Sequence, residues 1–151
     1  MTDRSWEEYL EIVPTVLLID DSKFLRRANE LSLARAGHLV LTASDGEEGL
    51  RVARDKKPDA IVLDMMLPKL GGAQLLQLLK ADPVTTSIPV IVLSSLPQKN
   101  AERLIADGAV AYLEKSQLEL EQSSNHLCKT VSKVLLSSAA RRVAATAPDQ
   151  G

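Results

Sequence analysis

The chain has 151 residues, enough for one domain with a sizeable core, and its formal net charge is −2 with 25% charged residues. This balance, without a basic stripe, argues against a protein that binds nucleic acid by itself. The single cysteine, Cys128, excludes an internal disulfide, and no apolar run is long enough for a membrane span. Because acidic residues crowd the N-terminus, a secretory signal is not expected, and we predict a cytoplasmic protein.

Residues 1–13 are predicted to form an N-terminal extension. Trp6, Tyr9, Leu10 and Val13 fall on one face at helical spacing, and Pro14 ends any such helix. We expect a short helix that covers an exposed apolar patch. A docking contact for a partner or a second subunit is the alternative that the pattern leaves open.

Short apolar runs then alternate with helical patterns five times along the chain. Runs without polar residues are typical of strands that helices cover on both faces. The strands are expected at Thr15–Ile19, Leu39–Ala43, Ala60–Leu63, Val90–Leu93 and Val110–Leu113. The alternation predicts an α/β fold, a doubly wound parallel sheet with right-handed crossovers.

The first two helices have recognisable ends. Ser22 is placed to cap the first helix, which runs to about Ala36 before Gly37 stops it. Ser44 or Asp45 caps the second helix, and one of the two glutamates that follow can close a capping box. We expect this helix to end near the Lys-Pro pair at positions 57 and 58.

The remaining helices are marked by glycine and proline. Gly71 and Gly72 are expected to allow the backbone turn into the third helix, Pro97 to lie in the first turn of the fourth, and Gly108 to end it. The last helix is expected to start near Gln117, and residues 138–151 could prolong it as far as Ala145 before a flexible tail. Residues 14–137 therefore form the predicted domain.

Polar side chains follow the strands at one end. Asp20 and Asp21 come directly after the first strand, Asp64 after the third, and Ser94 after the fourth, while Lys115 follows the fifth. Carboxyl ends of parallel strands meet at one edge of a sheet, so these groups should form one site. Carboxylates that crowd together favour a hard divalent cation such as Mg²⁺, and an aspartate beside it could become a phosphorylated nucleophile.

The chain resembles the receiver domains of bacterial two-component response regulators, in particular the chemotaxis-type (CheY-like) single-domain regulators. The motifs are Asp20-Asp21, the segment from Asp64 through Leu67-Pro68 to Gly72, Ser94, Gly108-Ala109 and Tyr112 to Lys115. They cover about residues 14–136. The resemblance implies a five-stranded, flavodoxin-like (βα)5 fold with strand order 2-1-3-4-5, and a phosphorelay module rather than an enzyme.

The resemblance also implies roles. Asp64 would accept a phosphoryl group from a histidine kinase or histidine phosphotransfer protein, with Mg²⁺ held by Asp20, Asp21, Asp64 and the Met66 carbonyl. Ser94 and Lys115 would contact the phosphoryl oxygens, while Ser94 and Tyr112 would switch the face made by the fourth helix, fifth strand and fifth helix. The downstream target is expected to be a protein, and a homodimer that forms on phosphorylation stays open.

Four positions, which make three departures, differ from the family pattern. Ser116 replaces the usual cis-proline after Lys115, Met66 and Leu96 are apolar where polar residues are frequent, and Gly71 replaces a frequent acid. Each site residue also has a plainer interpretation. Asp20 or Asp21 could cap a helix, Asp64 could be an ordinary turn residue, Lys115 a surface lysine, Ser94 a strand-end serine and Tyr112 a core residue.

Other functions stay open at this point. The chain could be the receiver fragment of a larger regulator, an idea that the Ala-rich end of the last helix favours. A haloacid dehalogenase-type phosphohydrolase also uses an aspartyl phosphate, but its acid/base position is Met66 here. A flavodoxin would need a phosphate-binding loop after the first strand, which the sequence lacks.

Overall fold

The computed structural model describes residues 13–94, 101–114 and 120–146, and side chains of the last segment from 125 to 139. Five strands alternate with five helices along these segments. The strands are β1 (Thr15–Ile19), β2 (Leu39–Ala43), β3 (Ala60–Asp64), β4 (Val90–Ser94) and β5 (Ala111–Glu114). The helices are α2 (Lys23–Arg35), α3 (Gly46–Lys56), α4 (Gly72–Ala81), α5 (Ala101–Ala106) and α6 (Leu120–Thr146). Within these segments we find no helix with the length and apolar character that a membrane crossing requires.

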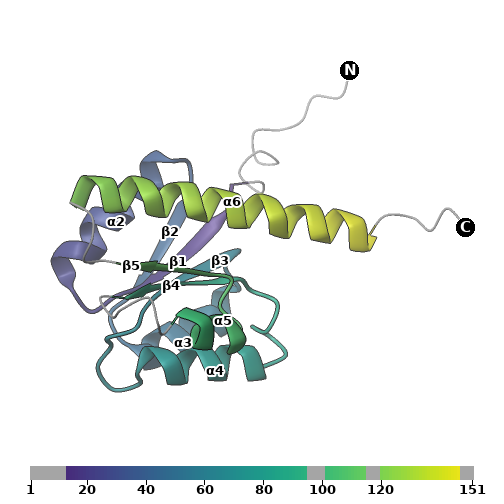
Figure 1. Ribbon diagram of the computed structural model, residues 1–151, viewed down its shortest axis with the longest axis horizontal. Coiled ribbons are helices and arrows are strands. Elements are labelled where there is room, and N and C mark those ends of the chain that lie inside the picture. The colour runs from purple at the N-terminus through teal and green to yellow at the C-terminus, as the bar shows by residue number, and fades with distance from the viewer. Residues whose placement is uncertain (1–12, 95–100, 115–119, 147–151) are drawn as a thin grey trace, which may run out of the picture.

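The strands form one parallel sheet in the order β2-β1-β3-β4-β5, which confirms the predicted order. Helices α2 and α6 cover one face of this sheet, while α3, α4 and α5 cover the other (Figure 1). The order reverses direction between the neighbouring strands β1 and β3. From β1 the chain continues to β2 at one edge of the sheet, and from β3 it continues to β4 and β5 at the other. In such doubly wound sheets the carboxyl ends beside this reversal form the usual ligand crevice.

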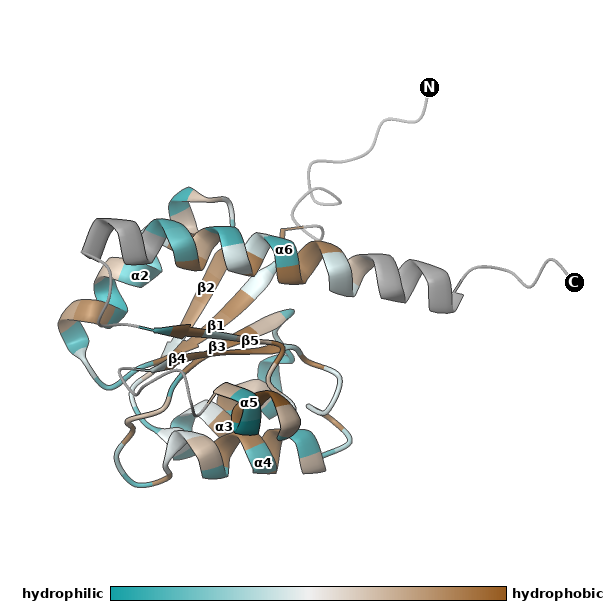
Figure 2. Ribbon diagram, viewed as in Figure 1, coloured by the Kyte–Doolittle hydropathy of each residue, from teal (hydrophilic) through white to brown (hydrophobic). Residues whose placement is uncertain are grey.

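The strand residues belong to two cores, one on each face of the sheet. Leu17 and Ile19 of β1 pack with α3 and α4, whereas Val16 and Leu18 pack with α2 and α6. Successive side chains of a strand point to opposite faces, so a strand covered on both sides has no polar position. The strands in the centre of the sheet are accordingly hydrophobic along their length (Figure 2).

Helix caps follow the sequence signals. The Ser22 hydroxyl accepts a hydrogen bond from the Leu25 N–H at 3.3 Å, and Gly37 ends the first connection at φ 99°. Asp45, not Ser44, is the cap of α3, and the Glu48 N–H that donates to its carboxylate lowers the pKa of Asp45. The Glu48 carboxylate in turn accepts from the Ser44 N–H at 3.2 Å.

Four strand boundaries differ from the prediction by one residue, and two of them are the ends of β4 at Ser94 and of β5 at Glu114. Strand β3 includes Asp64, whose backbone pairs in register with Leu93. Strand β5 begins at Ala111, because Val110 is exposed in the turn after Gly108 and pairing starts opposite Ile91. Helix α6 is continuous to Thr146 and extends past the sheet (Figure 1). The predicted N-terminal helix and the expected helix starts at Pro97 and Gln117 lie outside the described residues.

Candidate functional site

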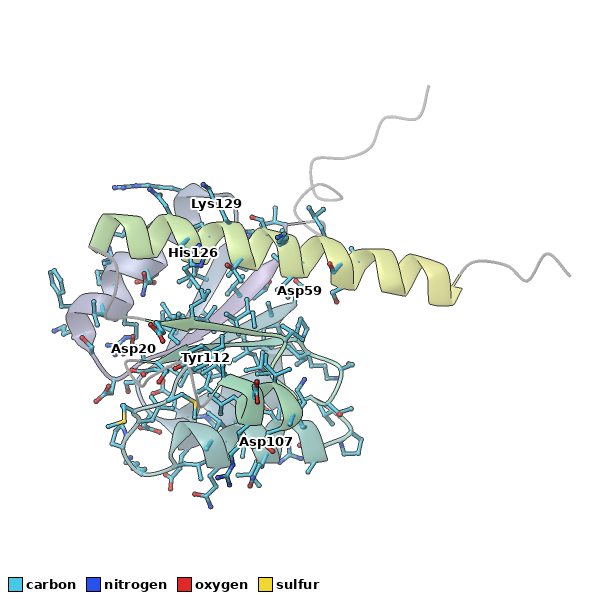
Figure 3. The ribbon with its side chains drawn as sticks, viewed as in Figure 1. Asp20, Asp59, Asp107, Tyr112, His126 and Lys129 are labelled. Atoms are coloured by element: carbon cyan, nitrogen blue, oxygen red, sulfur yellow. The ribbon has the colours of Figure 1, made fainter. Side chains whose placement is uncertain are left out.

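The polar ends of neighbouring strands meet at one edge of the sheet. Ile19 of β1 is in register with Leu63 of β3, so Asp20 and Asp64, the next residue of each chain segment, lie beside each other. Asp64 is in register with Leu93, which places Ser94 one position further along β4. Figure 3 shows Asp20 at this end of the sheet and Asp59 at the opposite end. The register therefore brings Asp20, Asp64 and Ser94 together at the ends of adjacent strands.

Asp20, Asp21 and Asp64 form a compact acidic cluster. Carboxylate oxygens of all three lie within 4.8 Å of one another. Asp20 is 0% exposed and Asp64 is 3% exposed, whereas Asp21 is exposed at the mouth. Two buried carboxylates this close repel by roughly 1–3.5 kcal/mol at an effective dielectric constant between about 80 and 20. Oxygen donors in this number and charge match the ligands that Mg²⁺ prefers, so the residues fit the predicted cation.

The chain holds Asp20 at several atoms. Its N–H donates to the Ala43 carbonyl of the neighbouring strand at 3.1 Å. Its carboxylate accepts from the Ser22 N–H at 2.9 Å, which aims the side chain across the sheet edge. Ser22 therefore both fixes this carboxylate and caps α2. The cap interpretation of Asp20 is wrong for this structure, since the cap is Ser22.

Asp64 is held by the loop that follows it. The Met66 N–H donates to its carboxylate at 3.1 Å, and the Met65 N–H continues the sheet by donating to the Leu93 carbonyl at 3.0 Å. Met66, two residues after Asp64, is 61% exposed. Asp64 is thus a buried strand residue rather than an exposed turn residue.

Gly72 lets the first turn of α4 approach this loop. A Cβ atom there would lie 2.6 Å from Met65 Cα and 2.8 Å from the Asp64 carbonyl oxygen. The chain turns into α4 at this pair as predicted, but neither Gly71 nor Gly72 has a positive φ, and Gly72 serves the turn by leaving space for the loop. Gly71 is the N-cap of α4, and a Cβ atom there would have nothing within 4 Å.

The other predicted site residues divide into described and undescribed positions. Ser94 is fully buried at the end of β4, where it pairs in register with Glu114. Tyr112 is half-buried on β5 and packs against the core on the α3 and α4 side. Lys115 lies outside the described residues, as do Ser95, Leu96 and Ser116. The position of the lysine relative to the acidic cluster therefore stays a prediction.

Two contacts of the loops that follow the strands were missed by the sequence analysis. The guanidinium of Arg26 donates to the Asp20 carbonyl at 2.8 Å. The Lys69 ammonium, on the loop after β3, lies 3.6 Å from the Asp45 carboxylate at the start of α3. A signal for the first was present, because α2 has no acid in its first turn and carries basic residues there, against the helix dipole. Such a local conflict indicates acidic groups outside the helix.

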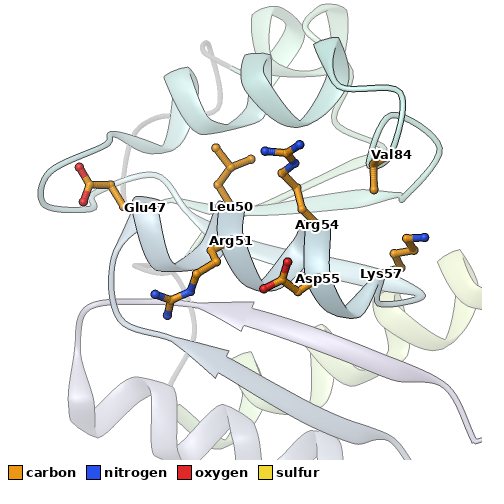
Figure 4. A pocket seen from close by; sticks show the side chains of 7 residues that line it. All are labelled: Glu47, Leu50, Arg51, Arg54, Asp55, Lys57 and Val84. Atoms are coloured by element: carbon orange, nitrogen blue, oxygen red, sulfur yellow. The ribbon is translucent and has the colours of Figure 1, made fainter.

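A second concave region lies on the outer side of α3, away from the cluster (Figure 4). Its lining has charges of both signs, with Arg54 joined to Asp82 at 2.9 Å. The lining residues are Glu47, Leu50, Arg51, Arg54, Asp55, Lys57 and Val84. Because acids and bases are interspersed here, this groove does not select a ligand charge as the acidic cluster does.

Three other titratable side chains on the described segments lie elsewhere and carry no site. Burial lowers the pKa of His38, and neither ring nitrogen of this half-buried residue has a hydrogen-bond partner in the described part of the chain. Burial raises the pKa of the Cys128 thiol on α6, which disfavours the reactive thiolate. His126 is exposed on the same helix (Figure 3).

Comparison with known proteins agrees with the geometry. The family model described as "Response regulator receiver domain" matches residues 16–127. Protein PilH of Pseudomonas aeruginosa is 34% identical over 121 residues, which are 80% of this chain and 96% of PilH. Protein PilG of the same organism is 41% identical over 103 residues, 66% of this chain and 75% of PilG.

Other curated relatives are longer proteins. Transcriptional regulatory protein AfsQ1 of Streptomyces coelicolor is 43% identical over 83 residues, 55% of this chain but 36% of AfsQ1. The chain likewise spans 14% of the gliding motility regulatory protein of Myxococcus xanthus. It therefore spans about half or less of several of the relatives that it matches.

Solved structures show the same fold. The signal receiver domain of a putative LuxO repressor protein from Vibrio parahaemolyticus has a TM-score of 0.78 at 22% identity, covering 88% of this chain and 98% of that one. Vibrio cholerae chemotaxis protein CheY4 has a TM-score of 0.71 at 28% identity, covering 81% and 98%. The first likeness shows the fold alone.

Proposed function

The chain belongs to the response regulator receiver domain family of two-component systems, and we propose that Asp64 accepts a phosphoryl group from a phosphohistidine donor in a Mg²⁺-dependent reaction. The donor would be a histidine kinase or a histidine phosphotransfer protein. The observation that carries the proposal is the cluster of three carboxylates within 4.8 Å, two of them buried, at the carboxyl ends of β1 and β3.

In this transfer a carboxylate oxygen of Asp64 forms a bond to phosphorus. The bond between phosphorus and the donor imidazole nitrogen breaks, and that nitrogen keeps the electron pair. Asp20, Asp21, Asp64 and the Met66 carbonyl would hold Mg²⁺, which when bound supplies positive charge between the carboxylate and the phosphoryl oxygens. The Met66 N–H holds one Asp64 oxygen at 3.1 Å, which orients the carboxylate for the reaction.

The phosphorylated state would act through contacts to the new anion. An acyl phosphate brings about 1.5 to 2 extra negative charges. Ser94 and Lys115 would donate to its oxygens, and Ser94 would move together with Tyr112 on the next strand. A switch from almost all inactive to almost all active needs roughly 5.5 kcal/mol. The surface that changes would be the face made by α5, β5 and α6, where a downstream protein binds.

We infer that the protein is a signalling module of the cytoplasm, where phosphohistidine donors act, with no chemistry beyond its own phosphorylation and slow dephosphorylation. A receiver fragment of a larger regulator is the alternative, and the greater length of several relatives supports it. Both alternatives share the same site. A homodimer formed on phosphorylation is a further open outcome of the switch.

Incubation with acetyl phosphate and Mg²⁺, followed by intact mass measurement, tests the proposal. We expect the mass of one phosphoryl group to be added, and to be absent with EDTA or in Asp64→Asn. Asp55→Asn is a matched control, since Asp55 is an exposed aspartate on α3 away from the cluster. A folded wild-type protein that gains no phosphoryl group, or a mutant that gains it equally, would contradict the proposal.

We expect the acyl phosphate to be comparatively long-lived, because Met66, two residues after Asp64, is apolar and would hinder an attacking water. Met66→Asn should speed dephosphorylation several-fold, since its amide can hydrogen-bond to water. The rate is read as loss of phosphoryl mass after the donor is removed. An unchanged or slower rate in Met66→Asn counts against this role.

A further inference from the structure

Arg26 is a basic residue that reaches back to the acidic cluster from the first turns of α2. Its guanidinium donates to the backbone carbonyl of Asp20 at 2.8 Å, and its own N–H donates to the Ser22 carbonyl at 2.8 Å. Its side chain is half-buried. We propose that Arg26 is a positioning residue for the cation site, acting by fixing the segment that carries Asp20 and Asp21. The proposal rests on the Mg²⁺ dependence proposed above.

The contact completes a set that fixes Asp20 at both ends of its peptide unit and at its side chain. The N–H is held by Ala43 at 3.1 Å, the carboxylate by the Ser22 N–H at 2.9 Å, and the carbonyl by Arg26. Hydrogen bonds from a charged donor are roughly twice as strong as neutral ones. Asp21 is exposed, and its backbone N–H shares a peptide bond with the Asp20 carbonyl. Fixing this carbonyl therefore also fixes the backbone of Asp21.

Charge alone predicts the opposite effect of Arg26. A guanidinium beside a cation site repels the cation, so its removal would strengthen Mg²⁺ binding on Coulombic grounds. A basic residue near a helix N-terminus also opposes the helix dipole. If Arg26 positions the ligand segment instead, its removal weakens Mg²⁺ binding. The sign of the change in affinity therefore separates the two effects.

The test is isothermal titration calorimetry of Mg²⁺ into the full unphosphorylated chain. We expect Arg26→Ala to raise the dissociation constant about tenfold, as other residues that orient metal ligands do. Arg26→Lys, which keeps the charge and a donor, should recover most of the affinity. Arg27→Ala is the matched control, because the neighbouring Arg27 is exposed and pairs with Glu30 at 2.9 Å on the outside of α2.

Thermal unfolding in EDTA and in saturating Mg²⁺ separates positioning from plain structural support. A structural role lowers the melting temperature equally in both, whereas positioning shrinks the rise that Mg²⁺ produces. Mg²⁺ binding by Arg26→Ala that is equal to or tighter than that of the wild type overturns the inference, and so does an equal loss of affinity in Arg27→Ala. An Arg26→Lys variant that binds Mg²⁺ as weakly as Arg26→Ala also overturns it. So does an Arg26→Ala variant whose melting temperature Mg²⁺ raises as much as that of the wild type. If Arg26→Ala does not fold, Arg26→Gln, which also lacks the charge, takes its place. A wild type that binds no Mg²⁺ overturns the proposed metal dependence as well.

Discussion

Asp64→Asn should make the metal-free protein more stable, by about 1–2 kcal/mol in free energy of unfolding, while abolishing most of the stabilisation by Mg²⁺. Asp20 and Asp64 are both buried with carboxylate oxygens within 4.8 Å, so neutralising one of them removes repulsion in the folded state. The amide oxygen of asparagine can still accept the hydrogen bond that the Met66 N–H donates at 3.1 Å. The change therefore removes charge and keeps the local geometry.

In the wild type, a bound cation would offset the repulsion between the carboxylates and so stabilise the folded state. A ligand that binds only the folded state stabilises it by about 2.7 kcal/mol at a hundredfold excess over its dissociation constant. Chemical denaturation should then give free energies of unfolding that depend differently on Mg²⁺. In EDTA the mutant should be the more stable protein, and at high Mg²⁺ the wild type should be at least as stable as the mutant. Asp55→Asn, exposed on α3, should follow the wild type. A wild type that Mg²⁺ does not stabilise would contradict the role of the cluster.

The fold could be predicted because its signals are local. Continuous apolar runs such as Val16–Ile19 and Ala60–Leu63 need cover on both faces, and two cores are what the structure shows. The acidic cluster could be predicted as well, since the carboxyl ends of parallel strands must meet at one edge. Both inferences need only the order of elements and the residue that ends each strand.

The contacts that the sequence analysis missed depend on how separate segments approach one another in the folded chain. The reach of Arg26 to the Asp20 carbonyl depends on the path of the chain from β1 into α2, and the pairing of Lys69 with Asp45 depends on how two loops pack. The reason for a glycine at position 72 could not be predicted for the same reason. A glycine pair suggests backbone freedom, but the requirement at Gly72 is space beside Met65.

Gly72→Ala should destabilise the protein by about 1–3 kcal/mol and weaken Mg²⁺ binding at the same time. Its Cβ would lie 2.6 Å from Met65 Cα and 2.8 Å from the Asp64 carbonyl oxygen, and backbone atoms cannot rotate away as a side chain can. The Gly72 N–H also donates to the Met65 carbonyl at 3.3 Å. Relief of the clash must push α4 and the loop apart. The displaced loop carries the Met66 carbonyl, which is expected to bind the cation.

Gly71→Ser supplies the matched control, one position earlier in the same turn. A Cβ atom at Gly71 meets nothing within 4 Å, its φ of −65° suits any residue, and serine is a favoured N-cap. We expect the unfolding midpoint in urea and the Mg²⁺ affinity of this variant to stay at or slightly above those of the wild type. If Gly72→Ala behaves like Gly71→Ser in both measurements, close approach of α4 to the loop is not what keeps the cation ligands in place. A loss of stability with unchanged Mg²⁺ affinity would instead confine Gly72 to helix packing, because the loop would then hold the Met66 carbonyl independently of α4.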